Sequence, residues 1–283
     1  MINRELIDFL IVSGSNAAIS AAKQIMNIYN SSDTFDVSVN TDNSVVIEAD
    51  RVAHEEIKRS LLPTRIPIMS EEGRNILFEE RLNWDLYWLV DPLDGTIEFI
   101  QKNDEFAISI AFMHNKTPLF GIIYLPTEGK LYFSDPDRGA FLLEGCDSMS
   151  EQLTTSTLFG AAKRLKLERN EDESIDKLNI VITRSHIDEK TNQIIDNFKE
   201  RYNEVNVINC GSAKKFALIV EGKADFYFRT TPLSDWDIAA GESIVKAYGA
   251  TIKSNDSGAE ITYNKKELVI APFYVTTLNE IKL

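Results

Sequence analysis

Asp91 and Asp94 stand three positions apart in a stretch, residues 88–99, whose residue types could do chemistry. The apolar start of this stretch predicts a buried strand, and Pro92 and Gly95 predict that the strand ends in a turn. Carboxylates held so close repel one another unless a cation lies between them, and hard divalent cations prefer carboxylate and carbonyl oxygens. Backbone N–H groups at and after Gly95 could face an anion. The pattern therefore indicates a metal ion on one side of the turn and a phosphate on the other.

Three other acidic residues could join this pair. Glu71 follows the short apolar run 66–69, so two neighbouring strands would bring Glu71 and Asp91 together. Asp237 opens a helix rich in small residues, where the helix dipole tolerates a carboxylate and another backbone can pack closely. Asp50 opens a second helix. Taken singly, each of the three also fits a helix cap or a surface acid.

The composition limits the class of protein. The chain has 283 residues, of which 43% are apolar and 26% charged, so it can bury one large core or two moderate ones. Its net charge of −14 argues against a non-specific nucleic-acid binder, which needs a basic face. Two cysteines, Cys146 and Cys210, are too few for a disulfide framework and fit a reducing compartment.

The same sequence shows neither a signal peptide nor a run near the roughly 18 apolar residues that span a bilayer. We therefore expect a cytoplasmic protein with no integral membrane segment, peripheral association with the inner face of the membrane being left open. The sequence leaves a monomer and a homodimer equally open.

The elements that must position these acids fall into two predicted domains. Residues 1–145 are expected to form an N-terminal α+β domain with two long helices and a mostly antiparallel sheet, carrying most of the metal ligands. Residues 146–283 are expected to form a C-terminal α/β domain that carries Asp237. The predicted helices are 4–29 (weakened at Gly14), 50–62, 188–202, 213–222 and 237–248, the last ended by Gly249. The predicted strands are 66–69, 87–90, 106–113, 119–125, 130–134, 139–143, 179–183, 205–209, 224–229, 250–253 and 268–271, with a loop or hairpin at 30–48 and a polar connector at 145–178.

Three motifs now carry a resemblance. The run Asp91–Phe99 resembles the signature of the inositol monophosphatase superfamily of metal-dependent phosphatases, and Ser70–Gly73 and Trp236–Gly241 resemble its two companion motifs in the right order. With the order of strands and helices, the similarity covers nearly the whole chain. It implies an α/β (α+β) layered αβαβα sugar-phosphatase fold. Within the superfamily, Glu98–Ile100 is most similar to the 3′(2′),5′-bisphosphate nucleotidases of the CysQ type, since inositol monophosphatases usually carry Asn before the Phe.

The resemblance implies two or three Mg²⁺ ions per active site. One would bind Glu71, Asp91 and the Leu93 carbonyl; a second would bind Asp91, Asp94 and Asp237; a third, weaker ion would lie near Glu71. Two ions about 4 Å apart can stabilise the attacking and leaving oxygens of an in-line displacement. Lithium inhibition is expected from the family.

The resemblance also implies catalytic and substrate-binding residues. Asp50, Thr96 and Glu71 would be catalytic, the Thr96 hydroxyl and Asp50 together orienting and deprotonating the attacking water. A further group of cations and polar residues would hold the second phosphate, the ribose and the base. The implied substrate-binding residues are Leu93, Asp94, Gly95, Thr96, His186, Ser212, Lys215, Arg229 and Asp237.

The implied activity is removal of the 3′-phosphate from adenosine 3′,5′-bisphosphate, extending to its 5′-phosphosulfate analogue, a small-molecule nucleotide rather than a nucleic acid. Two alternatives stay open: an inositol monophosphatase-like or broad sugar phosphatase, and a catalytically weak nucleotide-binding sensor. The chain departs from the family pattern at Asn40, Val45 and Ile47 in the loop before Asp50. It departs again at Ile97, where the nucleotidases usually carry Lys, and at Asp104, where Gly is common.

Overall fold

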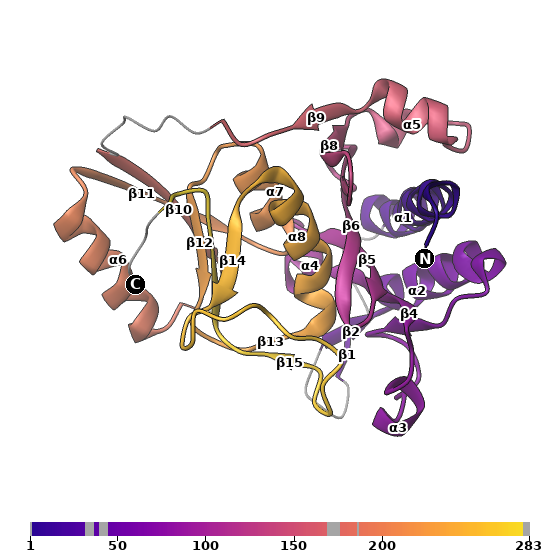
Figure 1. The fold of residues 1–283 in the computed structure, drawn as a ribbon, viewed down its shortest axis with the longest axis horizontal. Coiled ribbons are helices and arrows are strands. Elements are labelled where there is room, and N and C mark those ends of the chain that lie inside the picture. Colours follow the sequence, from indigo (N-terminus) through magenta and orange to yellow (C-terminus); the bar gives the residue numbers. More distant parts are fainter. Residues whose placement is uncertain (1, 32–36, 40–44, 169–175, 186, 280–283) are drawn as a thin grey trace.

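Five alternating layers of helix and sheet make up this protein (Figure 1). The computed structural model describes residues 2–31, 37–39, 45–168, 176–185 and 187–279. Helices α1 and α2 form the first layer, a seven-stranded sheet the second, helices α7 and α8 the third, a five-stranded sheet the fourth and helix α6 the fifth. The predicted αβαβα layering is confirmed.

The seven-stranded sheet is mostly antiparallel, as predicted. Only its first two strands run parallel, and every later pair is antiparallel. Its order is β3 (Ile68–Ser70), β4 (Leu86–Asp94), β5 (Ala107–His114), β6 (Thr117–Leu125), β7 (Lys130–Asp135), β8 (Gly139–Leu143) and β9 (Lys163–Leu165).

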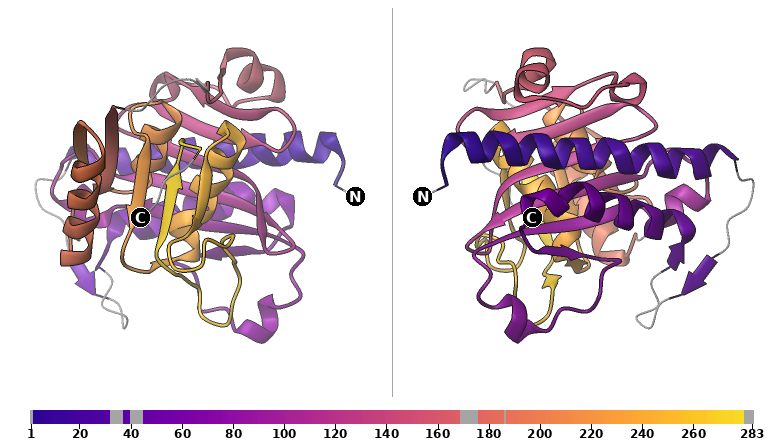
Figure 2. Two further views of the ribbon diagram at one scale, coloured as in Figure 1. Left: turned by 60° about the vertical axis from the view of Figure 1, so that its left-hand side comes forward. Right: turned by 90° about the vertical axis from the view of Figure 1, so that its right-hand side faces the viewer.

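Helices α1 (Arg4–Ser31) and α2 (Glu48–Leu61) lie side by side across the outer face of this sheet (Figure 2). Gly14 does not weaken α1, because it lets the helix lie directly on Ile122 of β6; a Cβ there would collide with that side chain. By length and composition α1 could cross a membrane, but more than half of its most apolar window is buried against the sheet. It therefore serves here as a core helix.

The five-stranded sheet is mixed, and helices flank it on both sides. Its order is β11 (Glu204–Cys210), β10 (Lys177–Thr183), β12 (Phe226–Arg229), β16 (Phe273–Thr276) and β14 (Thr251–Ser254), the first three being parallel. The remaining strands form two short antiparallel pairs, β1 (Val37–Val39) with β2 (Val45–Ile47) and β13 (Leu233–Ser234) with β15 (Val269–Ile270). The remaining helices are α3 (Phe78–Arg81), α4 (Thr96–Ile100), α5 (Thr155–Ala161), α6 (Glu189–Arg201), α7 (Lys214–Val220) and α8 (Asp235–Tyr248), with 3₁₀ turns η1 (Leu62–Thr64) and η2 (Cys146–Ser148).

The structure differs from the predicted elements in several places: α3 and β13 were not predicted, β4 extends beyond residue 90, and two larger differences concern the sheets. Residues 268–271 were expected to close the second sheet, but β15 pairs with β13, and the unpredicted strand β16 lies in the sheet instead. Residues 145–178 were expected to be a connector, yet they contain α5 and β9, and β9 pairs with β8 in the first sheet. Strand β9 thus extends the first sheet beyond residue 145; the domain boundary itself stays a prediction.

The central helix layer is packed unusually tightly between the two sheets. At Gly121 of β6 the backbone of Ala240 on α8 approaches so closely that a Cβ would collide with it. Gly241 is in similar contact with the Phe216 ring of α7. The small residues predicted to permit close packing at the start of α8 therefore do so. This packing fixes the position of the N-terminal end of α8.

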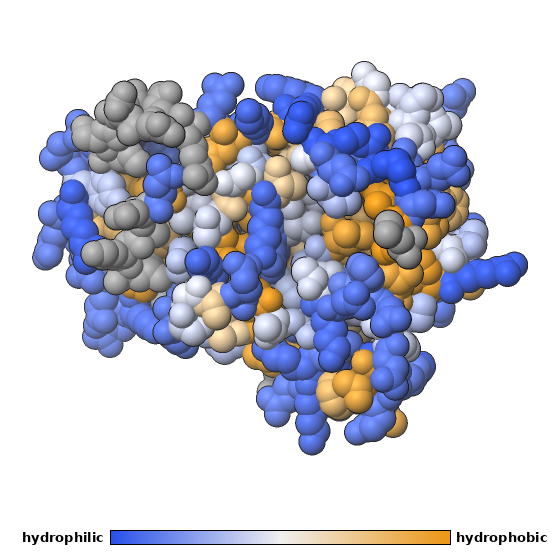
Figure 3. Space-filling model, in the orientation of Figure 1, coloured by the Kyte–Doolittle hydropathy of each residue, from blue (hydrophilic) through white to orange (hydrophobic). Residues whose placement is uncertain are grey.

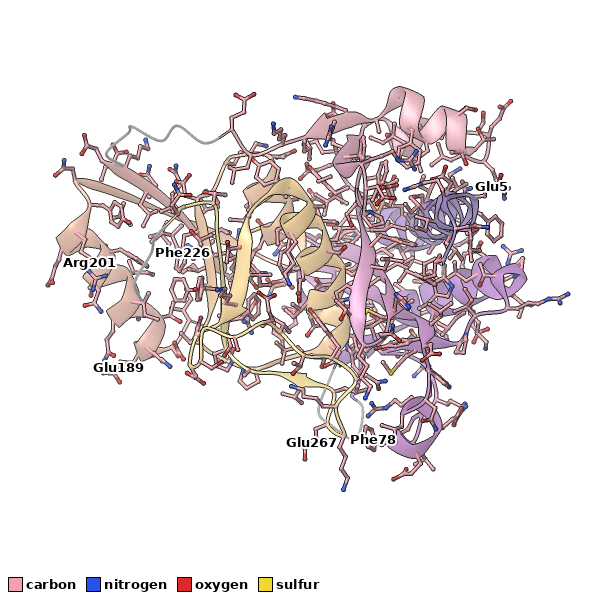
Figure 4. All side chains as sticks on the ribbon, viewed as in Figure 1. Glu5, Phe78, Glu189, Arg201, Phe226 and Glu267 are labelled. Carbon is pink, nitrogen blue, oxygen red and sulfur yellow. The ribbon has the colours of Figure 1, made fainter. Side chains whose placement is uncertain are left out.

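The outer helix α6 packs its apolar face against the second sheet. On the far side of the second sheet, Phe226 of β12 packs edge-on against Phe198 of α6, their ring centroids 5.2 Å apart, and Figure 4 shows Phe226 between that sheet and α6. The face drawn in Figure 3 is largely hydrophilic, in keeping with the net charge of −14.

Candidate active site

A β-bulge at the end of β4 presents the two aspartates from which the site is built. Asp91 is paired with Ser109 of β5, but Asp94 is paired with Ala107, so three steps along β4 match two along β5. Pro92 lacks an N–H and is tolerated at such a bulge. The Asp91 carboxylate accepts a hydrogen bond from Leu93 N at 3.0 Å, which holds it over the turn.

Gly95 ends the bulge in a left-handed conformation, with φ of +95°. A side chain there would be strained, and its Cβ would come within 3.1 Å of Ser212 Cβ. Helix α4 starts at the next residue, so the N–H groups of its first turn have no partner within the helix. The sequence predicted that the strand ends near residue 90 and that both aspartates lie on a turn; this was wrong, because β4 continues through Pro92 to Asp94 as a bulged strand. The predicted change of direction is confined to Gly95.

Glu71 lies beside Asp91 because β3 and β4 are parallel neighbours. Ser70 is paired with Val90, and Glu71 N donates a hydrogen bond to Val90 O at 3.1 Å. Glu71 therefore follows the end of β3 at the level of Asp91, so the two carboxylates are neighbours, as expected from the sequence, although β4 itself continues to Asp94.

Asp237 lies on the first turn of α8, in the helix layer between the two sheets. Its Oδ2 accepts a hydrogen bond from Ser234 N at 2.8 Å, so it is a helix-capping residue, which was the alternative interpretation from sequence. Its carboxyl is also close enough to that of Asp91 to share a hydrogen bond. Asp237 thus caps its helix with one oxygen and still reaches the acids of β4.

Asp50 caps α2 in the same manner and also contacts the bulge. Its Oδ2 accepts a hydrogen bond from Ile47 N at 2.7 Å, and its Oδ1 accepts one from Thr96 Oγ1 at 3.2 Å. Burial raises the pKa of Asp50 to about 7, with the charge of Glu72 adding to the effect. A carboxyl with such a pKa is suited to take up a proton near neutral pH.

The four predicted metal-ligating carboxylates perturb one another. Burial is the largest cause for each, and for Glu71, Asp91 and Asp94 repulsion from the other acids comes next; together they raise the pKa of Glu71 to about 8 and that of Asp94 to about 7. For Asp237, the hydrogen bond from Ser234 N and the nearby cations oppose the effect of burial. The pKa of Asp237 rises to about 6, and that of Asp91 rises well above its ordinary range. The Glu71 residue is exposed to water, but protein surrounds most of its carboxyl. These groups form one electrostatic cluster.

The chemistry of this cluster fits Mg²⁺, which prefers oxygen ligands. Each of Asp91, Asp94 and Asp237 uses one carboxylate oxygen for a backbone N–H and keeps the other for a ligand. Across the described part of the chain, no three Asp, Glu, His or Cys side chains stand ready to hold an ion without adjustment.

A pocket beside the cluster is lined by several predicted substrate-binding residues. Lys215 is buried; its Nζ donates to Ser212 O at 2.6 Å, and its charge lowers the pKa of Asp94. Arg229, also buried, donates to Thr231 Oγ1 at 3.0 Å. The predicted residues lining this pocket are Asp94, Gly95, Ser212, Lys215, Arg229 and Asp237.

The other predicted residues lie around this pocket or outside the description. Asp91 and Leu93 are buried in the bulge, and Thr96 follows Gly95 in the chain. His186 lies outside the described residues, so its predicted contact with the base stays a prediction. Lys214, a neighbour of Lys215, forms an ion pair with Glu128 at 2.7 Å and does not line the pocket.

The structure brings in residues to which sequence reasoning assigned no role. Glu98 lines the pocket from α4, and Ser185 lines it from the segment after β10. Glu105 accepts a hydrogen bond from Gly211 N at 2.8 Å and pairs with Arg184 at 2.7 Å. The position of Glu98 within the signature motif was the one available signal.

The fold and this acid cluster define a class of protein. The chain matches the model of the Inositol monophosphatase family over residues 7–281 and belongs to that family. The prediction of this membership, and of a phosphatase, is confirmed.

Several similar proteins are 3′(2′),5′-bisphosphate nucleotidases of the CysQ type, the group within the family that the sequence resembles. The 3′(2′),5′-bisphosphate nucleotidase CysQ of Buchnera aphidicola is 34% identical over 266 residues, which is 92% of this chain and 91% of that protein. The CysQ of Salmonella typhimurium is 32% identical over 263 residues, 92% of this chain and 96% of that protein. The crystal structure of CysQ from Bacteroides thetaiotaomicron, described as a bacterial member of the inositol monophosphatase family, superposes with a TM-score of 0.83 at 34% identity, covering 95% of this chain and 97% of that one.

Proposed function

We propose that this protein is a Mg²⁺-dependent phosphomonoesterase that removes the 3′-phosphate from adenosine 3′,5′-bisphosphate, giving AMP and phosphate, and that it also accepts the 5′-phosphosulfate analogue. The observation that carries the proposal is the shared position of Asp94 and Asp237, which belong to the acid cluster and also line the pocket that contains Lys215 and Arg229. Acids for a metal and cations for a second phosphate thus meet in one place. The names of the CysQ relatives support the same substrate.

Glu71, Asp91, the Leu93 carbonyl, Asp94 and Asp237 would hold two or three Mg²⁺ ions. When bound, Mg²⁺ lowers the pKa of an attacking water and stabilises negative charge on phosphate oxygens.

Side chains and backbone groups of the protein transfer the proton and bind the two phosphates. Because Thr96 Oγ1 donates to Asp50 Oδ1, the hydroxyl oxygen is left to accept a proton from the attacking water while its own proton passes to Asp50. The N–H groups of Gly95 and Thr96 donate to oxygens of the phosphate that is cleaved. Lys215 and Arg229 bind the phosphate that is kept, which explains a preference for a bisphosphate.

The test is a substrate panel with purified protein and Mg²⁺. Phosphate release is measured from adenosine 3′,5′-bisphosphate, inositol 1-phosphate and fructose 1,6-bisphosphate. We expect the nucleotide to have the highest kcat/KM, Asp94→Asn to abolish release, and Asp196→Asn, which changes an exposed acid on α6, to leave it intact. Preference for either sugar phosphate would reject the nucleotide assignment, and release unaffected by Asp94→Asn would reject the site.

We place the enzyme in the cytoplasm. The two cysteines support this, since Cys146 and Cys210 are both free and buried.

A further inference from the structure

Glu98 is a buried carboxylate in the wall of the substrate pocket that the proposed chemistry does not use. It lies on α4, two residues after Thr96, and its residue is only 6% exposed. The same pocket is lined by Asp94, Lys215 and Arg229. A buried carboxylate is costly unless its oxygens are hydrogen-bonded, so its presence here calls for a partner.

The surrounding chain holds Glu98 in place. Ser185 Oγ donates to Glu98 Oε1 at 2.9 Å. Gly211 lies against the Glu98 side chain so closely that a Cβ at that position would collide with it. Within the described residues, the one side-chain hydrogen bond to this carboxylate is that from Ser185 to Oε1, so Oε2 can accept another.

In the part of the chain that the structure describes, neither cation of the pocket is hydrogen-bonded to Glu98, although Lys215 is close enough to interact with its charge. Lys215 Nζ donates to the carbonyls of Cys210 and Ser212, and Arg229 donates to Thr231. A carboxylate can only accept hydrogen bonds, and it repels phosphate oxygens. Its partner in the loaded pocket must therefore be an uncharged donor, such as a hydroxyl group of the substrate.

The position of that donor follows from the position of Glu98 along α4. The phosphate that is cleaved is assigned to the N–H groups at the start of this helix, and Glu98 follows within one turn on the same pocket wall. The group nearest to the cleaved phosphate in a sugar phosphate is the hydroxyl on the neighbouring carbon.

We propose that Glu98 is a specificity-determining residue that accepts a hydrogen bond from the sugar hydroxyl next to the cleaved phosphate. The assignment rests on the proposed function, and for adenosine 3′,5′-bisphosphate that hydroxyl is the 2′-OH. Ser185 and Gly211 position the carboxylate for this contact.

The experiment compares adenosine 3′,5′-bisphosphate with 2′-deoxyadenosine 3′,5′-bisphosphate in the wild-type enzyme and in Glu98→Ala and Glu98→Gln. Because a hydrogen bond to a charged group is a strong one, the wild-type kcat/KM should favour the ribonucleotide by about tenfold or more. In Glu98→Ala this ratio should fall to about one, through loss of activity on the ribonucleotide alone. Glu98→Gln, which keeps a neutral acceptor, should show an intermediate ratio.

Asp196→Asn is the control, since it changes an exposed carboxylate on α6 that does not line the pocket. The ratio should stay at its wild-type value in this variant. A wild-type ratio near one, or the same ratio in Glu98→Ala as in the wild type, would overturn the role of Glu98 alone. Absence of phosphate release from both nucleotides by the wild type would overturn the proposed function, and this assignment with it.

Discussion

Thr96 Oγ1 lies 3.2 Å from Asp50 Oδ1, although 46 positions separate the two residues in the chain. The contact joins the start of α4, where the phosphate is assigned, to the start of α2. Asp50 is held from its other side by Ile47 N, so the carboxylate has little freedom to turn away. In the proposed mechanism this pair provides a fixed route for a proton to leave the reaction centre.

Asp50→Asn should lower kcat strongly while leaving the fold intact. Asn can still accept the hydrogen bond from Ile47 N, but it cannot take up a proton. We expect kcat to fall by roughly 10²–10⁴-fold, the usual contribution of a general base. Steady-state phosphate release measures the effect, with Glu48→Gln, an exposed acid on the same helix turn, as control. Loss of less than about tenfold would remove Asp50 from the mechanism.

The metal-free protein should lose stability as the pH rises. The folded-state pKa values of Glu71, Asp94 and Asp237 are raised to about 8, 7 and 6, so between about pH 4 and these values the folded state holds protons that the unfolded state has released. The free energy of unfolding must then fall as the pH rises through this range. Urea unfolding in the presence of EDTA, at about pH 5.5 and about pH 8.5, measures it.

Mg²⁺ should reverse this trend, stabilising the protein more at the higher pH, where the carboxylates are ionised. Asp94→Asn removes one repelling charge and should make the metal-free protein more stable than the wild type at about pH 8.5, with a smaller difference at about pH 5.5. A metal-free wild type that becomes more stable as the pH rises would contradict the coupling of these acids.

Ile97→Lys should tighten binding of a bisphosphate. Ile97 is 38% exposed and lines the pocket, at the position where the resembling nucleotidases carry Lys. An added cation at an exposed edge contributes up to about 1 kcal/mol, so we expect KM for adenosine 3′,5′-bisphosphate to fall by about two- to fivefold. The gain should shrink at high salt, and Ile97→Gln should not reproduce it. An unchanged KM at low ionic strength would show that Ile97 does not face the substrate.

Gly121→Ala should destabilise the protein and weaken metal binding together. The added Cβ would collide with the backbone of Ala240, pushing α8 and its Asp237 away from the sheet. We expect a loss of about 1–3 kcal/mol in the free energy of unfolding. Gly160→Ala is the matched control, because a Cβ at this helical position meets nothing within 4 Å. Full stability in Gly121→Ala would mean that the two layers are not in the close contact described.

The layered fold and the grouping of the acids were predictable from the motifs, whereas individual contacts between distant segments were not. The left-handed conformation of Gly95 leaves a signature within a few residues, but the bulge around Asp91 and Asp94 was predicted as a turn. The periodicity of α1 was readable too, but its tolerance of Gly14 depends on Ile122, a residue of another layer.

Strand β16 was missed because the predicted strand stopped before Pro272, and the four residues after it are defined by pairing with β12 and β14. The contact between Glu98 and Gly211 was missed for a different reason. It joins segments more than a hundred residues apart, and the sequence around neither residue indicates a contact with the other. The acid cluster was inferred from the sequence motifs. The structure adds that Asp91, Asp94 and Asp237 each accept a hydrogen bond from a backbone N–H with one carboxylate oxygen.

The central claim is that four carboxylates from β3, β4 and α8 bind Mg²⁺ jointly. Calorimetric titration of EDTA-stripped protein with Mg²⁺ tests it most directly, in the wild type, Asp94→Asn, Asp237→Asn and the surface control Asp196→Asn. The account predicts about two or more ions bound per wild-type chain, fewer in each of the two site variants, and no change in the control. Absence of Mg²⁺ binding by the wild type, or equal binding by all four proteins, would contradict it.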